Sequence, residues 1–388
     1  MKKIVYLSSA IIMLLLITYS CKKEFATSKT DENSNYLRQD HNNDLLQIVI
    51  NKFQYIDRNG HEQEMLVFKS DDDYFAQLDR LDMLDDQHEQ DFLNRHPNAT
   101  EEEINRFDSI EQFNEYQVFL DFDDNLNFNG LIHNYIDAEN EWLSHNDLPD
   151  NLDPDNIYFG LDENELAILN QDYAYMIDNG GKNPIIVKHY PDGAVIINDG
   201  SINTLNQISQ YSQIAGNGVF VDGLTNVEVF EDPVNTGYCI MSNTERDYRT
   251  VGNNKRIKGM IKVKYFQSGG IVITRNKVKV KAKSIKRNWL GMWCRYRVCH
   301  IKAAVDGVVS IGDPANVCGN DNFIFNPDVD KKERSCASKV KYKKYFPNND
   351  PAFQYNVNFE NQKLWGYYFS DHSPRFKLDA YDGTFISY

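Results

Sequence analysis

Acidic residues are absent from one long stretch of this sequence, between Tyr248 and Val305, although the chain as a whole is acidic. The 388 residues carry a formal net charge of −16. Residues 1–245 hold 14 Lys and Arg against 45 Asp and Glu, whereas residues 246–388 hold 27 against 12. The chain is therefore divided into an acidic half and a basic half, which indicates two domains with different electrostatic roles.

Long apolar runs and recognisable catalytic motifs are also lacking. No stretch reaches the roughly 18–20 apolar residues of a spanning helix, which excludes a multi-pass membrane protein. His61-Glu62 and His88-Glu89 begin a zincin pattern, but Met65 and Phe92 occupy the positions of the second histidine. There is no Gly-x-Ser-x-Gly elbow, phosphate-binding loop, dinucleotide fingerprint or Cys-x-x-Cys. We therefore predict no catalytic residue set, no metal and no cofactor, and enzyme activity is not the favoured class.

The first residues are typical of an export signal. A basic Met1-Lys2-Lys3 is followed by an apolar run from Ala10 to Ile17, which is too short to span a bilayer. Ser20 directly before Cys21 resembles a bacterial lipoprotein cleavage box. We predict that residues 1–20 are a signal peptide and that Cys21 becomes a lipidated N-terminus held in a membrane. A plain secretory signal with an incidental cysteine is the alternative.

The residues after Cys21 refine the predicted location. Lys22-Lys23-Glu24 is similar to the charged tag that sends some Bacteroidetes lipoproteins to the outer face of the outer membrane. Residues 21–44 are polar and rich in Asn, Asp, Ser and Thr, as in a flexible tether. We expect a protein anchored in the outer membrane by its lipid. Surface display is the finer expectation, and the side of the membrane that it faces stays open.

The acidic half, residues 45–245, has the patterns of a mixed helical and hairpin domain. Asn59-Gly60 between apolar runs predicts a hairpin with a primed turn. Ser70 and Thr100 each precede three acidic residues and predict helix starts, because the hydroxyl can cap and the acids favour the positive end of the helix dipole. The predicted elements are strands over 45–56 and 64–68, helices starting at Ser70 and Thr100, helices over 131–143 and 162–170, a hairpin over 185–190 and 194–198, a helix over 201–211 and a strand over 227–230.

Two short segments carry a resemblance to known proteins. Leu66-Val67-Phe68-Lys69-Ser70 leads into a helix, and Ala167-Ile168-Leu169-Asn170 leads into a hairpin. This layout resembles uncharacterised outer-membrane and surface lipoproteins of Bacteroidetes, over residues 45–205. The resemblance implies a lineage and a location, and it carries no activity.

The basic half, residues 246–388, changes to β patterns. Turn signals fall at Gly269-Gly270, Asp306-Gly307 and Asp382-Gly383, each between runs in which apolar residues alternate. This spacing favours an antiparallel β-sandwich-like domain. The predicted fold class is therefore α+β, with a mixed helical and hairpin domain followed by this β-domain.

Cations alternate with apolar residues in a predicted hairpin of the basic half. Because successive side chains of a strand point to opposite faces, the cations lie on one face and the apolar residues on the other. A two-residue turn at Gly269-Gly270 would pair residue i with residue 539−i. The expected pairs are Lys258 with Lys281, Lys262 with Lys277, and Lys264 with Arg275. The predicted polyanion-binding face comprises Arg256, Lys258, Lys262, Lys264, Arg275, Lys277, Lys279, Lys281 and Lys283, and the alternating run 339–343 extends it.

Three interpretations of this cationic face compete. It is a solvated face without a partner, or it docks against the acidic half of the same chain, or it binds an external polyanion. The external candidates are acidic polysaccharide, lipopolysaccharide, an acidic protein or extracellular nucleic acid, whereas intracellular nucleic acid is not expected. The leading hypothesis is a binding or interaction module attached to the membrane by its lipid. A cell-surface hydrolase that uses acidic residues of the N-terminal half is the alternative.

Five cysteines remain if Cys21 is lipidated, and an exported chain meets an oxidising compartment. Two disulfides and one free thiol are therefore expected, with the connectivity open. A hairpin turning at Asp306-Gly307 would make Cys294 and Cys318 neighbours. The disulfide candidates are Cys239, Cys294, Cys299, Cys318 and Cys336.

Two further patterns carry weaker hypotheses. Acidic and amide residues alternate from Asp121 to Asn129 before Gly130, as in a calcium loop, but Ile136 stands where an EF-hand needs a glutamate. An ordinary acidic loop is the alternative. Trp289 to Trp293 lies between basic runs, where tryptophans stack on sugars or, more commonly, pack into a core.

Overall fold

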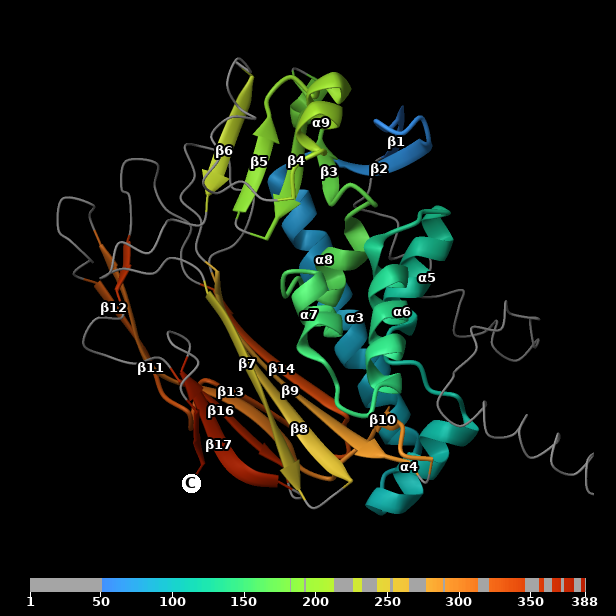
Figure 1. Cartoon of the computed structure of the whole chain (residues 1–388), viewed down its shortest axis with the longest axis vertical. Helices are drawn as coiled ribbons and strands as arrows, with labels where there is room; N and C mark the ends of the chain where they lie inside the picture. The colour runs from blue at the N-terminus through green and yellow to red at the C-terminus, as the bar shows by residue number, and fades with distance from the viewer. Residues whose placement is uncertain are drawn as a thin grey trace, which may run out of the picture.

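The computed structural model shows an α+β fold, which confirms the predicted class (Figure 1). Most helices of the acidic half lie on one side of the molecule, beside a six-stranded sheet above and two sheets of the basic half below. The predicted boundary at residues 245/246 falls within a strand, and the domain division stays a prediction. The structure describes residues 51–181, 183–191, 193–212, 226–231, 243–251, 254–264, 277–288, 290–312, 321–345, 356–358, 365–370, 373–379 and 385–387.

The first sheet has the strand order β1-β2-β3-β4-β5-β6, with β2 and β3 parallel and the other neighbours antiparallel. The predicted hairpins β1–β2 and β4–β5 are confirmed, and Gly60 in the first turn has a φ of 86°, which favours glycine. The bounds are β1 Asn51–Ile56, β2 Glu62–Phe68, β3 Ala174–Ile177, β4 Ile185–Tyr190, β5 Gly193–Ile197 and β6 Val227–Glu231.

The predicted helix starts are confirmed at both capping sites. Ser70 Oγ accepts a hydrogen bond from the Asp73 amide at 3.2 Å, and Thr100 and Glu103 form a reciprocal capping box. The helices are α3 Asp71–Arg95, α4 Glu101–Ile110, α5 Gln117–Leu126, α6 Leu131–Ser144, α7 Pro154–Ile157, α8 Glu163–Ile168 and α9 Ile202–Ile208, with short 3₁₀ turns η1 Asp150–Leu152 and η2 Asn179–Gly181.

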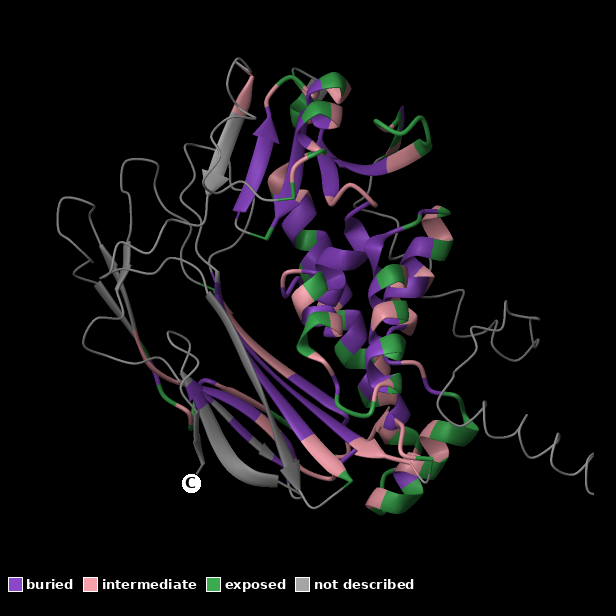
Figure 2. Ribbon diagram, in the orientation of Figure 1, coloured by how far each residue is buried: buried purple, intermediate pink, exposed green. Residues whose placement is uncertain are grey.

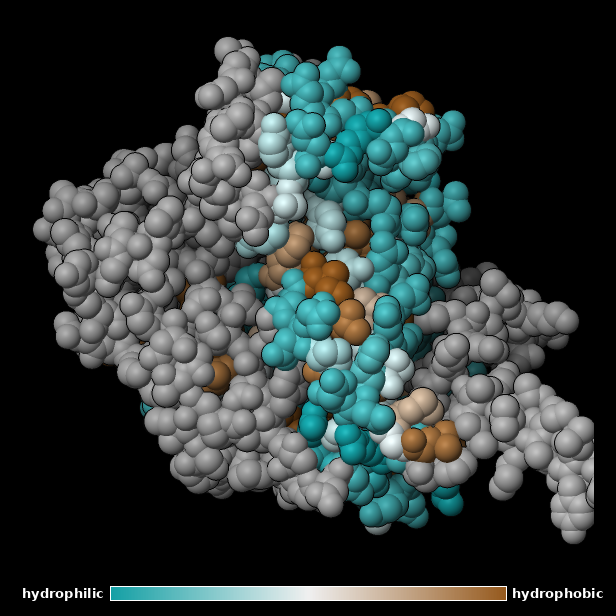
Figure 3. Space-filling view, viewed as in Figure 1, coloured by the Kyte–Doolittle hydropathy of each residue, from teal (hydrophilic) through white to brown (hydrophobic). Residues whose placement is uncertain are grey.

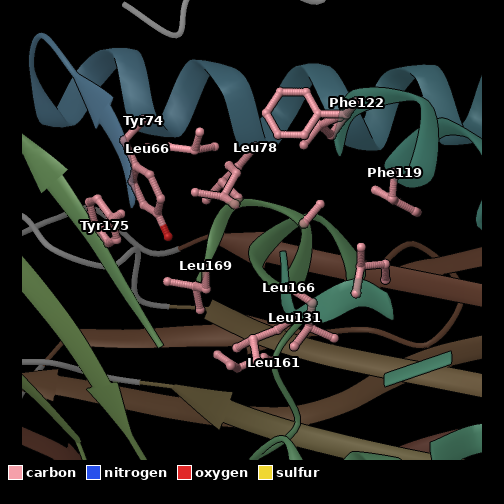
Figure 4. Close-up of a cluster of buried hydrophobic side chains, with 14 of the residues drawn as sticks. Leu66, Tyr74, Leu78, Phe119, Phe122, Leu131, Leu161, Leu166, Leu169 and Tyr175 are labelled. Carbon is pink, nitrogen blue, oxygen red and sulfur yellow. The ribbon is translucent and has the colours of Figure 1, made fainter. Parts of the chain in front are cut away.

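A shared apolar core holds α3, α5, α6 and α8 against the first sheet (Figure 4). Tyr74 of α3 stacks on Tyr175 of β3 with ring centroids 4.1 Å apart. Around them pack Leu66, Leu78, Phe119, Phe122, Leu131, Leu166 and Leu169, which are all buried. This packing fixes the helices whose outer turns carry the acids described below.

The calcium-loop hypothesis is wrong, because Asp121 and Asp123 lie on α5. The helix forms there since Phe119, Leu120 and Phe122 bury one face of it. Among the described residues, no group of three or more His, Cys, Asp and Glu could hold a metal ion.

The basic half folds into two antiparallel sheets that pack face to face. One sheet runs β10-β9-β8-β7 with β14 also paired to β9, and the other is built around β11 and β16. Val278, Val280 and Ala303 are among the buried residues between them. The bounds are β7 Asn243–Val251, β8 Lys255–Lys264, β9 Lys277–Arg287, β10 Trp293–Arg295, β11 Ile301–Gly312, β12 Asp321–Phe325, β13 Lys331–Arg334, β14 Lys339–Tyr345, β15 Asn356–Asn358, β16 Trp365–Ser370, β17 Ser373–Asp379 and β18 Phe385–Ser387.

Two local predictions in the basic half are wrong. Asp306-Gly307 is not a turn, because β11 runs through it, and Gly307 instead takes a φ of 125° within the strand. The β8–β9 register is shifted by two residues from the predicted one. The observed pairs are Lys258 with Lys283, Lys262 with Lys279, and Lys264 with Lys277. A shift of two leaves each side chain on its predicted face, so burial selects the faces and not the exact register.

Candidate functional site, a buried layer of ion pairs

Most of the predicted cationic face is buried between the two halves of the chain. Figure 2 shows the burial of β8 and β9 where they lie beside the helices. Together with three lysines of β14, the buried members form what we call the lysine layer. It consists of Lys258, Lys262, Lys277, Lys279, Lys281, Lys283, Lys339, Lys341 and Lys343.

The described residues do not place the other three predicted members in the lysine layer. Arg256 is half-buried, with its guanidinium carbon 4.6 Å from the centre of the Trp293 ring. Lys264 ends β8, and the structure does not describe its side chain. Arg275 and both turn glycines fall outside the described residues. The structure thus brings six of the nine predicted residues together and confirms the extension by β14.

Strand geometry explains why these lysines share one face. On β9 the lysines alternate with Val278, Val280 and Ala282, which enter the apolar core of the sandwich. The lysine side chains therefore leave the opposite side of the sheet, toward the helices. β14 pairs with β9 so that Lys339, Lys341 and Lys343 stand opposite Lys283, Lys281 and Lys279.

A set of carboxylates from the acidic half covers the lysine layer, and we call it the carboxylate layer. Its members come from α3, the α4–α5 connection, α6, the η1–α7 turn and the start of α8. They are Asp82, Glu115, Glu139, Asp153, Asp155, Asp162, Glu163 and Glu165.

The start of α8 lies at the centre of the contact. Asp162 lies 2.7 Å from Lys277, 2.6 Å from Lys279 and 2.9 Å from Lys343. Glu163 lies 3.0 Å from Lys281, 3.4 Å from Lys339 and 3.2 Å from Lys341. Two adjacent carboxylates therefore bind six ammonium groups across two strands.

The remaining contacts extend the layer in both directions. Lys258 binds Asp153 at 2.6 Å and Asp155 at 2.5 Å. Glu139 pairs with both Lys283 and Arg295. Two backbone carbonyls also take part, since Lys262 donates to Phe159 O at 2.5 Å and Lys279 to Gly160 O at 2.9 Å.

The electrostatics favour the ionised carboxylates. Burial alone would raise the pKa of Asp162, but the ammonium groups of Lys277, Lys279 and Lys343 outweigh it and hold that pKa well below its usual value. The pKa of Glu163 is depressed in the same way by Lys281, Lys339 and Lys341. Burial alone would lower the pKa of Lys281. The carboxylates of Asp155 and Glu163 outweigh this effect, so the pKa of Lys281 is raised. These groups are therefore charged at neutral pH.

Arg297 forms a second buried connection between the halves. Its guanidinium binds both oxygens of Glu89 on α3 and lies 2.6 Å from Asp108 on α4. It is stacked between Phe92 and Phe113, with its guanidinium carbon 4.4 and 4.6 Å from the two ring centres. This contact fixes the far ends of α3 and α4 to the basic half.

The tryptophan segment follows the packed-core interpretation where the structure describes it. Trp293 is buried, and its indole nitrogen donates to Asn146 O at 3.0 Å. Trp289 lies outside the described residues.

A small cavity adjoins the charged layers. It is lined by Tyr74, Asp162, Lys277 and Tyr345 among others, and it has room for about one water molecule. Figure 3 shows that the described surface of the helical half is predominantly hydrophilic from this side.

Two carboxyl groups of the acidic half, Asp85 and Asp123, have the raised pKa that the hydrolase alternative needs, and burial is the main cause for both. Burial raises the pKa of Asp123 to about 6, against the opposing effects of His133 and the Gly130 amide. Asp123 Oδ2 accepts from the Gly130 amide at 2.9 Å and lies 3.3 Å from His133 Nε2. These contacts join α5 to the first turn of α6, which is a structural role.

Three of the candidate cysteines lie among the described residues. Cys299 and Cys336 are free thiols with sulfur atoms 2.8 Å apart. Cys239 and Cys318 fall outside the described residues, so the pairing of Cys294 with Cys318 stays a prediction. The hairpin at Asp306-Gly307 that suggested this pairing is absent, as described above.

The comparisons with known proteins place few limits on function. No family model and no curated protein matches the chain. A solved structure of a DUF4848 family protein from Bacteroides thetaiotaomicron is similar at 11% identity and a TM-score of 0.17, covering 83% of this chain and 96% of that chain. A likeness this low carries no argument about fold or activity. Within the described residues, none of the helices is both long and apolar enough to cross a membrane.

We predict that Glu163→Gln lowers the free energy of unfolding by about 3–5 kcal/mol at pH 7, because three buried lysines lose their shared counter-charge. Glu102→Gln is the matched control. Glu102 is exposed on α4, so its loss should change stability by less than about 0.5 kcal/mol. Equal effects of the two changes in urea titrations would contradict the buried layer.

The difference between wild type and Glu163→Gln should also depend on pH. A depressed folded-state pKa contributes stability above the unfolded pKa, near 4.5 for glutamate, and this contribution is lost as the pH falls below that value. The difference should therefore shrink by about 1.4 kcal/mol per pH unit below pH 4.5. A difference that stays constant down to pH 3 would show that Glu163 is not held ionised by its lysines.

Proposed function

We propose that this protein is an interaction module whose lysine layer binds an acidic partner, and that this partner is the acidic half of the same chain. The observation that carries the proposal is the occupation of the lysine layer. The described partners of its ammonium groups include carboxylates and backbone carbonyls of the acidic half. Of the three sequence interpretations, internal docking is the one that this geometry supports.

The covalent connection between the halves favours internal docking over an external polyanion. A tethered partner is present at an effective concentration in the millimolar range or above, without the translational entropy loss of a free ligand. An external polyanion would have to displace the carboxylate layer, of which seven members are buried and already desolvated. Binding of acidic polysaccharide or lipopolysaccharide at the lysine layer therefore requires the two halves to separate.

We place this module at the outer membrane, anchored through a lipid on Cys21 and spaced from the bilayer by residues 21–44. The support is the export signal and cysteine of the sequence, which lie outside the described residues. The charged helical surface away from the lysine layer is then free to meet partners at the cell envelope.

Heparin-column retention tests the proposal. Because the lysines are occupied, wild-type protein should elute at or below about 0.15 M salt at neutral pH. The matched control replaces Lys332 and Arg334 by Ala, since these are half-buried cations on Asp86 outside the lysine layer. The proposal is contradicted if wild type elutes well above that salt concentration and the control variant elutes at the same salt concentration as wild type. The lysine layer would then bind an external polyanion.

The anchor has a separate test. Cys21→Ser should move the protein from the membrane fraction to the soluble fraction and abolish incorporation of labelled fatty acid, because the acceptor sulfur is gone. Cys299→Ser, which removes a free thiol in the folded part, should leave both unchanged. Membrane retention of Cys21→Ser would refute anchoring through this residue.

A further inference from the structure

A pair of thiols lies at the junction between the basic half and the ends of α3 and α4. Val298 and Ala337 form an isolated antiparallel bridge in which each amide donates to the other's carbonyl at 3.1 Å. Cys299 and Cys336 are the next residues along the two segments and therefore stand opposite each other. The bridge thus holds the two cysteines at neighbouring positions on adjacent segments.

The side chains already point at each other. The two sulfur atoms are 2.8 Å apart, less than about 1 Å beyond the length of a disulfide bond. Both residues are partly exposed, so a reagent in solution can reach them.

The surroundings connect this pair to the contact between the halves. Cys336 has a φ of 56°, in the left-handed region, and its carbonyl accepts from Arg297 Nη1 at 3.0 Å. The Cys299 amide donates to Glu101 Oε2 of α4 at 3.4 Å. A disulfide here would link the segment that carries Arg297 to the segment whose carbonyl Arg297 binds. It would therefore hold Arg297 in place against Glu89 and Asp108.

We infer that Cys299 and Cys336 form a disulfide bond when the chain meets a disulfide-bonded oxidant, such as an oxidised dithiol protein or oxidised glutathione. The thiolate of one cysteine attacks the oxidant's disulfide and releases one oxidant thiol. The thiolate of the other cysteine then attacks the mixed disulfide and releases the second oxidant thiol. The new S–S bond replaces two S–H bonds, and two electrons and two protons pass to the oxidant. This site does not depend on the proposed function.

Peptide mapping of the full-length chain tests the inference, because trypsin separates the relevant cysteines. Cys299 falls in the peptide 298–302, Cys336 in 335–339 and Cys294 in 288–295. After oxidation with oxidised glutathione and alkylation of free thiols, the first two peptides should appear joined, lighter by two hydrogen atoms than their sum. Reduction should separate them.

Variants make the test specific. Ser335→Ala, an exposed position beside the pair, should keep the joined peptide, and Cys299→Ser should abolish it. Wild type should also melt several degrees above the Cys299→Ser/Cys336→Ser double variant under oxidising conditions, and this gap should vanish under reduction. Recovery of both peptides in alkylated form after oxidation, or joining of either one to a different cysteine, would overturn the inference.

Discussion

The contact between the lysine and carboxylate layers is the constraint on which the arrangement of the two halves depends. Lys343 stands opposite Lys279, and Lys279 opposite Lys262, so like charges form rows across three strands. Like charges directly opposite each other destabilise a sheet, and each buried ion loses several kcal/mol of hydration. This face of the sheet can therefore be buried only where carboxylates cover it. Asp162 and Glu163 meet this requirement at the centre, and Asp82, Asp155 and Glu139 meet it around them.

Buried ion pairs of this kind fix geometry more than they add net stability. Replacing a whole buried pair by apolar side chains is often neutral, whereas removing one partner is costly because the other charge stays buried. We interpret the charged layers as the feature that selects one docking position for the helices on the sheet. Arg297 acts in the same way at the far end, where aromatic rings and two carboxylates hold its guanidinium.

The lysine face could be predicted from the sequence, but the carboxylate layer that buries it could not. Strict alternation of Lys277, Lys279 and Lys281 with valine and alanine assigns each side chain to a face whatever the exact register. The register itself depends on the turn, and it differs from the predicted one by two residues. The acids that cover the lysines follow no shared spacing, because they come from five separate segments brought together by the helical core.

Other outcomes divide in the same way between local signals, which the sequence shows, and long-range packing, which it does not. Ser70 and Thr100 mark helix starts that the structure contains, because a capping hydroxyl is a local signal. α5 was not expected, since its Asp and Asn residues favour a loop and only tertiary packing of Phe119 and Phe122 outweighs this preference. The proximity of Cys299 and Cys336, 37 residues apart, depends on the same kind of long-range packing.

Lysine accessibility tests the burial of the lysine layer most directly. Native protein is treated with an amine-acetylating reagent, and the extent of labelling at each lysine is read by mass spectrometry. We predict that Lys258, Lys279, Lys281 and Lys283 react at least tenfold more slowly than the exposed Lys69, and that the difference disappears in denaturant. Labelling of these four lysines at the rate of Lys69 in the native protein would contradict the docking of the acidic half on the lysine layer.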